Sequence, residues 1–285
     1  MEYITLGKTG RKVSRLGFGG TVAGLKNYVH AFDPEEEKNK QQLIDAMKKA
    51  YELGINYFDT AASYGNGISE RIFGEGLESI DPKEIFLATK ASISDAKTAR
   101  ESLERSLKNL RRDKIDLIQI HGSVYSKEQY DMIMGKGGMA EALEKAILEG
   151  LVENIGFTIE CQNEALYQFI HSKRFDVMQI EYNLIFQHPY DPSFQCGSMY
   201  DAEEEQLGVI VMRSVTSGIF QKWIKMVNPE NTFNYNPALI QLVLSNPIVD
   251  VALLGMRSAE RVIENVNTCN ELSGRIDLNA LHMRY

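Results

Sequence analysis

The sequence predicts a single (β/α)₈ barrel that covers residues 1–285. Short apolar segments alternate with longer amphipathic ones along the chain, and there are eight of each. Eight such units in a chain of 285 residues fit this barrel in count and size. The competing architecture, an open doubly wound sheet, would start with a glycine-rich turn leading directly into a helix. After Gly17-Phe18-Gly19-Gly20 the pattern indicates no helix starting at once.

The strand candidates are mostly runs of four to six mainly apolar residues, as expected for parallel strands covered on both faces. They are residues 16–20, 56–60, 85–90, 116–121, 153–158, 176–181, 208–212 and 249–254.

The helix candidates carry apolar residues at helical spacing, for example Leu103, Leu107 and Leu110. They are residues 35–53, 69–78, 99–110, 139–149, 163–172, 202–207, 237–245 and 258–271. The sixth has the weakest pattern and follows a loop rich in Pro, Ser and Gly, residues 187–197. Before the first barrel strand, residues 2–6 and 12–15 flank a glycine-containing turn, which predicts a β-hairpin that closes the bottom of the barrel.

Composition argues against several functional classes. Hydrophobic residues make up 44% of the chain and the formal net charge is −8, without the basic cluster expected of a nucleic-acid-binding protein. No apolar stretch approaches the roughly 18 residues that suggest a membrane span. Cys161, Cys196 and Cys269 lack metal-ligand spacing, so no metal site is expected. With no apolar signal-peptide core near the N-terminus, reduced thiols and a cytoplasmic location are expected.

Three successive predicted strands end in an ionisable residue: Asp59, Lys90 and His121. Tyr64 lies five residues after Asp59, in the loop that follows the same strand. Barrel enzymes place their chemistry at the carboxyl ends of the strands, and neighbouring strands bring these ends together. A lysine carried into the barrel mouth also needs a carboxylate nearby, because an unpaired buried charge is very unfavourable.

Each of these residues also has a structural interpretation when taken alone. An aspartate after a strand is commonly a helix cap, and a lysine can extend to the surface. The histidine and the tyrosine can simply pack in their loops. A different chemistry would make Lys90 a Schiff-base nucleophile. That mechanism needs a neutral amine, whereas Asp59 would keep Lys90 protonated.

In order and position, Asp59, Tyr64, Lys90 and His121 resemble the catalytic tetrad of the aldo-keto reductase superfamily. The segments 16–20, 58–61, 64–70 and 179–183 are similar as well, and the resemblance extends from about residue 4 to residue 267. It implies NAD(P)H-dependent reduction of an aldehyde or ketone to an alcohol, with a small carbonyl or alcohol molecule as substrate.

The residue types suit that reaction, because hydride arrival at a carbonyl carbon requires a proton donor and charge stabilisation. Tyr64 is the candidate general acid and base. The reference pKa of tyrosine is about 10, and an adjacent ammonium lowers it. Lys90 would supply this charge, Asp59 would hold Lys90 in place, and His121 would donate a hydrogen bond to the substrate oxygen.

The resemblance also implies a set of cofactor-binding residues. Thr158 and Gln179 would bind the carboxamide, which needs both donors and acceptors. The set further includes Gly20, Thr21, Met212, Arg213, Ser217 and Gly218.

Two of these positions depart from the usual pattern. Many family members have an aromatic residue and then serine where this chain has Met212 and Arg213, so stacking on the nicotinamide is expected to be weaker. Arg213 would reach a phosphate or substrate anion, or else point outward. Ser217 and Gly218 are expected near the pyrophosphate.

The last predicted strand, its turn and the next helix form a natural anion site. By the resemblance, Gly255, Met256, Arg257 and Arg261 belong to this site, and Glu264 and Asn265 match the family positions that meet the adenine. The two arginines favour NADP(H) over NAD(H), and NAD(H) remains the alternative cofactor. Gly255 stands where the family has a lysine, so the preference for NADP(H) rests on the arginines. The other interpretation of the arginines is that they pair with Glu260 or Glu264.

Substrate contacts are expected from loop residues, with packing inside the loops as the alternative for each. These residues are Tyr28, Phe32, Tyr125, Tyr130, Met132 and Met134. Trp223 is either part of a lid or a surface residue. A second class of function is a non-catalytic NADP(H)-binding sensor or regulatory subunit on the same barrel.

Overall fold

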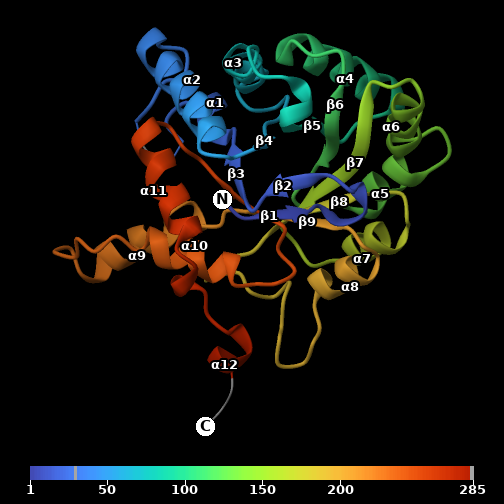
Figure 1. Ribbon diagram of the computed structural model, residues 1–285. Coiled ribbons are helices and arrows are strands. Elements are labelled where there is room, and N and C mark those ends of the chain that lie inside the picture. The colour runs from blue at the N-terminus through green and yellow to red at the C-terminus, as the bar shows by residue number, and fades with distance from the viewer. Residues whose placement is uncertain (29–30, 283–285) are drawn as a thin grey trace.

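The computed structural model of the protein describes residues 1–28 and 31–282. Within them, eight parallel strands close into a barrel, which confirms the predicted fold (Figure 1). The strands are β3 (Leu16–Gly19), β4 (Tyr57–Asp59), β5 (Phe86–Ser92), β6 (Ile115–His121), β7 (Val152–Ile159), β8 (Val177–Glu181), β9 (Gly208–Met212) and β10 (Val251–Leu254). They follow one another around the barrel in chain order, and the pairing of β10 with β3 closes it.

The helices between the strands surround the barrel as an outer layer (Figure 1). They are α2 (Glu37–Glu52), α3 (Ile68–Gly76), α4 (Ala96–Leu110), α6 (Met139–Leu148), α7 (Glu164–His171), α8 (Ser198–Glu204), α10 (Asn236–Leu244) and α11 (Ala259–Asn270). Each corresponds to a predicted helix. The prediction for α8 was shifted along the chain, because the buried side of this helix is formed by Ser198, Met199 and Ala202 and so starts before residue 202.

Further short helices occur in segments expected to be loops. They are α1 (Thr21–Gly24), α5 (Lys127–Met134), α9 (Ile219–Val227) and α12 (Leu278–His282). The expectation that no helix follows Gly20 at once is therefore wrong, although α1 is a single turn. α5 begins with a capping box in which Ser126 and Gln129 satisfy each other's backbone N–H groups. α9 buries none of its own residues and lies at the left edge of Figure 1.

The N-terminal hairpin closes the bottom of the barrel, as predicted. Strands β1 (Tyr3–Thr5) and β2 (Lys12–Ser14) pair antiparallel. The buried side chains of Leu6 and Val13 pack against apolar residues inside the barrel. Arg11 fixes the turn from outside: its guanidinium donates to Asp116 and Glu153, at 2.8 Å each, and to the carbonyl of Ile85 at 3.1 Å. These three acceptors lie at or near the starts of β6, β7 and β5.

The inside of the barrel changes character along its axis, because side chains alternate between the two faces of each strand. At the bottom, Tyr57, Phe86, Leu117 and Val177 form an apolar layer. Along each of these strands, the next inward-facing residue comes two positions later. The inward-facing residue after that lies at the mouth of the barrel. The described residues contain no helix that is both long enough and apolar enough to cross a membrane.

The Arg11 contacts make the hairpin a testable part of the fold. Arg11→Ala leaves Asp116, which is largely buried, without its cation. We expect the free energy of unfolding to fall by about 1–2 kcal/mol, as measured by urea denaturation. Arg105→Ala, at an exposed position on α4, is the matched control. An equal, small effect in both variants would contradict the assigned role of Arg11.

Candidate functional site

The four residues predicted at the strand ends lie together at the mouth of the barrel. The Lys90 ammonium donates to Asp59 Oδ1 and, at 2.8 Å, to the carbonyl oxygen of Thr60. Its Nζ atom is 5.2 Å from the centre of the Tyr64 ring. The Tyr64 ring meets the His121 ring edge to face, with centroids 5.5 Å apart and planes at 84°. The structure therefore brings one carboxylate, one ammonium, one phenol and one imidazole around a common point.

Strand periodicity explains why these side chains face inward. On β5, Phe86 and Ala88 belong to the apolar interior, so Lys90 is the next inward position. On β4, Asp59 follows the interior residue Tyr57 in the same way. The cross-strand register places Asp59 beside Ala88, one step below Lys90, which lets the long lysine side chain reach the carboxylate.

The charges of the buried pair are mutually dependent. Lys90 is 1% exposed and Asp59 is 2% exposed. Burial works against the Lys90 ammonium, but Asp59 and Tyr64 outweigh it, and the pKa of Lys90 is raised above its usual value. Burial also raises the pKa of the Asp59 carboxyl, while the ammonium of Lys90 and the amide of Gln119 oppose its protonation. The ion pair is therefore the favoured form, and a neutral, nucleophilic Lys90 is not.

His121 is neutral at physiological pH. Burial, together with the positive charge of Lys90, lowers the pKa of His121 to about 4. The Ser63 hydroxyl lies 3.0 Å from His121 Nδ1, and the ring proton lies on Nε2 when this hydroxyl donates to Nδ1. Sequence reasoning missed Ser63. Its place next to Tyr64 was the only signal, and the contact joins residues that are 58 positions apart in the chain.

A buried chain of amides continues from the ion pair across the barrel. Gln119 on β6 donates to Asp59 Oδ2 at 3.3 Å and to Gln179 Oε1 at 3.0 Å. The Gln179 side-chain nitrogen in turn lies 3.6 Å from the sulfur of Met212. Two predicted cofactor residues, Gln179 and Met212, are thus adjacent to the four catalytic candidates. Gln119 was not among the predicted site residues, because as one polar residue in an apolar run it gave no separate signal.

Thr158, the other predicted carboxamide ligand, is buried on β7 beside this cluster. Its hydroxyl donates to the carbonyl of Gly122 at 2.7 Å and accepts from the N–H of the same residue at 3.0 Å. This exchange fixes the backbone that directly follows His121. Gly20 also contacts the site through its backbone, since its N–H donates to the carbonyl of Asp59 at 2.7 Å, and Thr21 begins α1 next to it.

The guanidinium of Arg213 is engaged with carboxylates. It donates to Glu160 at 3.0 Å and lies 3.6 Å from Glu181. Its backbone φ is +57°, and the following turn has Thr216 at +61° and Ser217 at +49°. Non-glycine residues with positive φ cluster at sites where a loop must present particular groups. Gly218 follows them at +80° and precedes the first residue of α9, and Tyr28 contacts Ser217 through hydroxyl groups 3.4 Å apart.

The two arginines of the last unit differ in their surroundings. Arg257 donates to the carbonyl of Tyr28 and lies over the ring of Phe32, 4.6 Å from its centre. No carboxylate within residues 1–28 and 31–282 pairs with Arg257, and its buried Nε has no hydrogen-bond partner there. Burial lowers the pKa of Arg257. Arg261, by contrast, is exposed and pairs with Glu264, as the alternative interpretation of the sequence anticipated.

The remaining residues of this unit surround the helix start. Gly255 is exposed and borders Val22 of α1, where a Cβ atom would come within 2.7 Å of a Val22 methyl group. The side chains of Met256 and Asn265 are both buried, and the side chain of Met256 is part of the apolar core. Ser258 caps α11 by accepting from the N–H of Arg261 at 3.3 Å.

Among the aromatic and methionine residues suggested for the substrate pocket, Phe32, Tyr130 and Met134 are partly buried against the apolar core. Tyr125 is buried, and its hydroxyl donates to the carbonyls of Thr158 and Ile120. Phe32 lies under the guanidinium of Arg257. Met132 and Trp223 are exposed.

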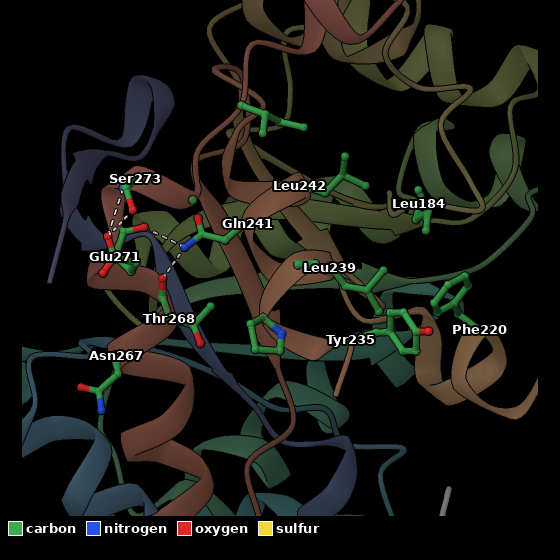
Figure 2. A pocket seen from close by; sticks show the side chains of 14 residues that line it. Leu184, Phe220, Tyr235, Leu239, Gln241, Leu242, Asn267, Thr268, Glu271 and Ser273 are labelled. Carbon is green, nitrogen blue, oxygen red and sulfur yellow. Dashed lines mark hydrogen bonds between the residues drawn. The ribbon is translucent and has the colours of Figure 1, made fainter. Parts of the chain in front are cut away.

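A separate hollow of about 710 Å³ lies outside the barrel, between α10, α11 and the segment after α11 (Figure 2). Apolar side chains such as Phe220 and Leu239 line one part of it, and Thr268 and Glu271 line another. Gln241 between them donates to the carbonyls of Thr268 and Glu271. None of the four catalytic candidates lines this hollow.

Comparison with known proteins adds independent evidence. A family model described as the aldo/keto reductase family matches residues 15–241. The L-galactose dehydrogenase of Arabidopsis thaliana is 32% identical over 166 residues, which are 55% of this chain and 48% of that enzyme. The methylglyoxal reductase DkgA of Escherichia coli K12 is 38% identical over 122 residues, which are 42% of this chain and 41% of that protein. The chain thus matches less than half the length of either relative.

Solved structures resemble the whole fold. The holo form of the aldo-keto reductase AKR11C1 from Bacillus halodurans has a TM-score of 0.78 at 21% identity, covering 99% of this chain and 95% of the other. An aldo-keto reductase from Klebsiella pneumoniae in complex with NADPH has a TM-score of 0.71 at 19% identity, covering 99% and 93%. The family model covers most of the barrel, including the three strand-end residues and Tyr64, which meet at its mouth. The chain belongs to the aldo/keto reductase family.

Proposed function

We propose that the protein is an NADP(H)-dependent oxidoreductase that reduces an aldehyde or ketone to an alcohol. The observation that carries this proposal is the buried Lys90–Asp59 ion pair, with its ammonium directed at Tyr64 and His121 packed against the same ring. Burying an ion pair is unfavourable unless the geometry compensates for lost hydration. A charge kept at this point suits a reaction in which a neighbouring phenol must lose its proton.

In the proposed mechanism, Tyr64 donates its hydroxyl proton to the substrate oxygen and takes it back in the alcohol-oxidising direction. The ammonium of Lys90 stabilises the phenolate that remains after donation. Neutral His121, with its ring proton on Nε2, donates a hydrogen bond that orients the carbonyl oxygen. When bound, the reduced nicotinamide supplies the hydride that the carbonyl carbon receives.

The residues at the mouth fit a nicotinamide dinucleotide. Among the described residues, the one acceptor that the side-chain nitrogen of Gln179 meets is the sulfur of Met212, so a donor is available for a carboxamide oxygen. At the other end, Arg257 is a half-buried cation with an unsatisfied Nε and no carboxylate partner among the described residues. A phosphate would satisfy it, which favours NADP(H) over NAD(H). Thr158 would join Gln179 at the carboxamide. Ser217 and Gly218 would face the pyrophosphate, and the start of α11 would hold the adenosine end.

Replacing Tyr64 tests the mechanism directly. Tyr64→Phe keeps the ring against His121 but removes the transferable proton, so we expect cofactor binding to be kept and kcat to fall at least ~100-fold. The assay follows NADPH oxidation with a panel of aldehydes and ketones. Tyr3→Phe, at an exposed hydroxyl on β1, is the control. An unchanged kcat would remove Tyr64 from the mechanism, and wild-type binding without any turnover would favour the sensor or regulatory function.

The neutral state of His121 has a measurable linkage to stability. The folded protein binds this proton near pH 4 and the unfolded chain near pH 6.5. The contribution to stability is therefore complete above pH 6.5 and is lost as the pH falls towards 4. Between pH 7 and pH 5, we expect wild type to lose about 1–2 kcal/mol more unfolding free energy than His121→Gln. An NMR titration midpoint near 6.5 for the His121 ring would contradict this assignment.

The choice between cofactors depends on Arg257. Arg257→Met keeps an apolar stem over Phe32 and removes the charge, so kcat/KM with NADPH should fall about 10- to 100-fold. Because NADH lacks the 2′-phosphate, its kcat/KM should change much less. Arg105→Met on α4 controls for the loss of one positive charge. Equal losses with NADPH and NADH would show that Arg257 does not contact the 2′-phosphate.

A further inference from the structure

Gln119 occupies a position that the proposed mechanism has not used. It lies on β6 two residues before His121, on the inward-facing side of the strand, and is fully buried. Its side-chain nitrogen donates to two acceptors on other strands, Asp59 Oδ2 on β4 and Gln179 Oε1 on β8. It is therefore a physical link between the catalytic ion pair and a residue expected to bind the nicotinamide.

The two acceptors fix the orientation of the Gln119 amide. If the amide were turned over, its oxygen would face the oxygens of Asp59 and Gln179, and both contacts would become repulsive. In the observed orientation the Gln119 oxygen is buried and has no hydrogen-bond partner among the described residues. An unsatisfied buried acceptor is unfavourable. This orientation therefore depends on the two bonds donated by the nitrogen.

The Gln119 amide in turn fixes Gln179. Because Gln179 Oε1 already accepts from Gln119, turning the Gln179 amide over would bring two NH₂ groups into contact. The Gln179 nitrogen must therefore point the other way, where the one acceptor it meets within residues 1–28 and 31–282 is the Met212 sulfur, at 3.6 Å. Thioether sulfur is a weak acceptor. Gln179 is thus held as a hydrogen-bond donor that lacks a strong acceptor.

We propose that Gln119 is a positioning residue that holds Gln179 as a donor to the carboxamide oxygen of the nicotinamide while it also holds the second oxygen of Asp59. This inference rests on the proposed NADP(H)-dependent function and deepens it. One amide then fixes the position of the residue that would bind the nicotinamide and the position of the carboxylate that holds Lys90. The residue itself touches neither cofactor nor substrate.

The test is to remove the donors of Gln119 without changing its length. In Gln119→Met, we expect the Kd for NADP⁺ to rise about tenfold, the scale of one lost hydrogen bond to a preorganised donor. Adenosine 2′,5′-bisphosphate lacks the nicotinamide, so its Kd should stay within about twofold of wild type. A merely structural role would weaken both ligands together or neither. Binding is measured by calorimetry, without turnover.

Gln241→Met is the matched control. Gln241 is also buried and donates to two carbonyls, but it lies on α10 outside the barrel. The Gln241→Met variant should be less stable than wild type, but its ratio of the Kd for NADP⁺ to the Kd for adenosine 2′,5′-bisphosphate should be unchanged. In Gln119→Glu, the shape is kept but an acceptor replaces the donor, so the NADP⁺ Kd should rise at least as much as in Gln119→Met.

Wild type provides a check that needs no variant. The thionicotinamide analogue of NADP⁺ replaces the carboxamide oxygen with sulfur, and it should bind several-fold more weakly than NADP⁺. The 3-acetylpyridine analogue keeps the carbonyl oxygen, so Gln119→Met should raise its Kd by about the same factor as that of NADP⁺. Equal binding of the thio analogue, or an unchanged Kd ratio in Gln119→Met, would overturn the inference. If wild type bound none of these nucleotides, the proposed function would fail instead.

Discussion

The ion pair between Lys90 and Asp59 is the constraint around which the rest of the site is arranged. Two charges removed from water are unfavourable unless their remaining hydrogen-bonding groups are also satisfied. Here the ammonium has the carboxylate and the carbonyl of Thr60, and the second carboxylate oxygen has the amide of Gln119. These groups come from three neighbouring strands. The pair is therefore stable only when the barrel is closed in this register, and the same register brings Tyr64 and His121 to it.

The barrel interior supports this arrangement by separating apolar from polar side chains along its axis. Tyr57, Phe86 and Leu117 fill the lower part and stack against the hairpin that covers the bottom. Each of these strands then continues with a polar residue at the next or second-next inward position, so the polar layer has a packed apolar base. Burial strengthens the interactions of the Lys90 ammonium with Asp59 and Tyr64. The burial of His121, together with the charge of Lys90, lowers the pKa of His121.

The parts of the fold that could be predicted are those with a local pattern. The strands were apolar runs, and most helices had an amphipathic stripe. Three of the four catalytic candidates stood at strand ends and Tyr64 in the adjoining loop, in an order that resembles a known family. Pairings between distant side chains had no such pattern. The engagement of Arg213 with Glu160 and Glu181, the burial of Tyr125, and the contact of Ser63 with His121 each depend on loops that meet only after the barrel has closed. The one-turn helix α1 and the early start of α8 were missed for the opposite reason, since short helices are set by tertiary packing more than by sequence period.

Charge gives the final link between composition and function. A chain with a formal net charge of −8 repels a phosphorylated ligand at long range, so any affinity for one must arise locally. Most arginines near the mouth cannot provide it, because Arg213 and Arg261 are already paired with carboxylates. Arg257 differs: it is half-buried, it lies over an aromatic ring, and its hydrogen-bonding capacity is only partly used. A cation that is already partly removed from water binds an anion more favourably than an exposed arginine does, because less hydration must be displaced on binding. The acidic composition therefore strengthens the argument that phosphate recognition is concentrated at this residue.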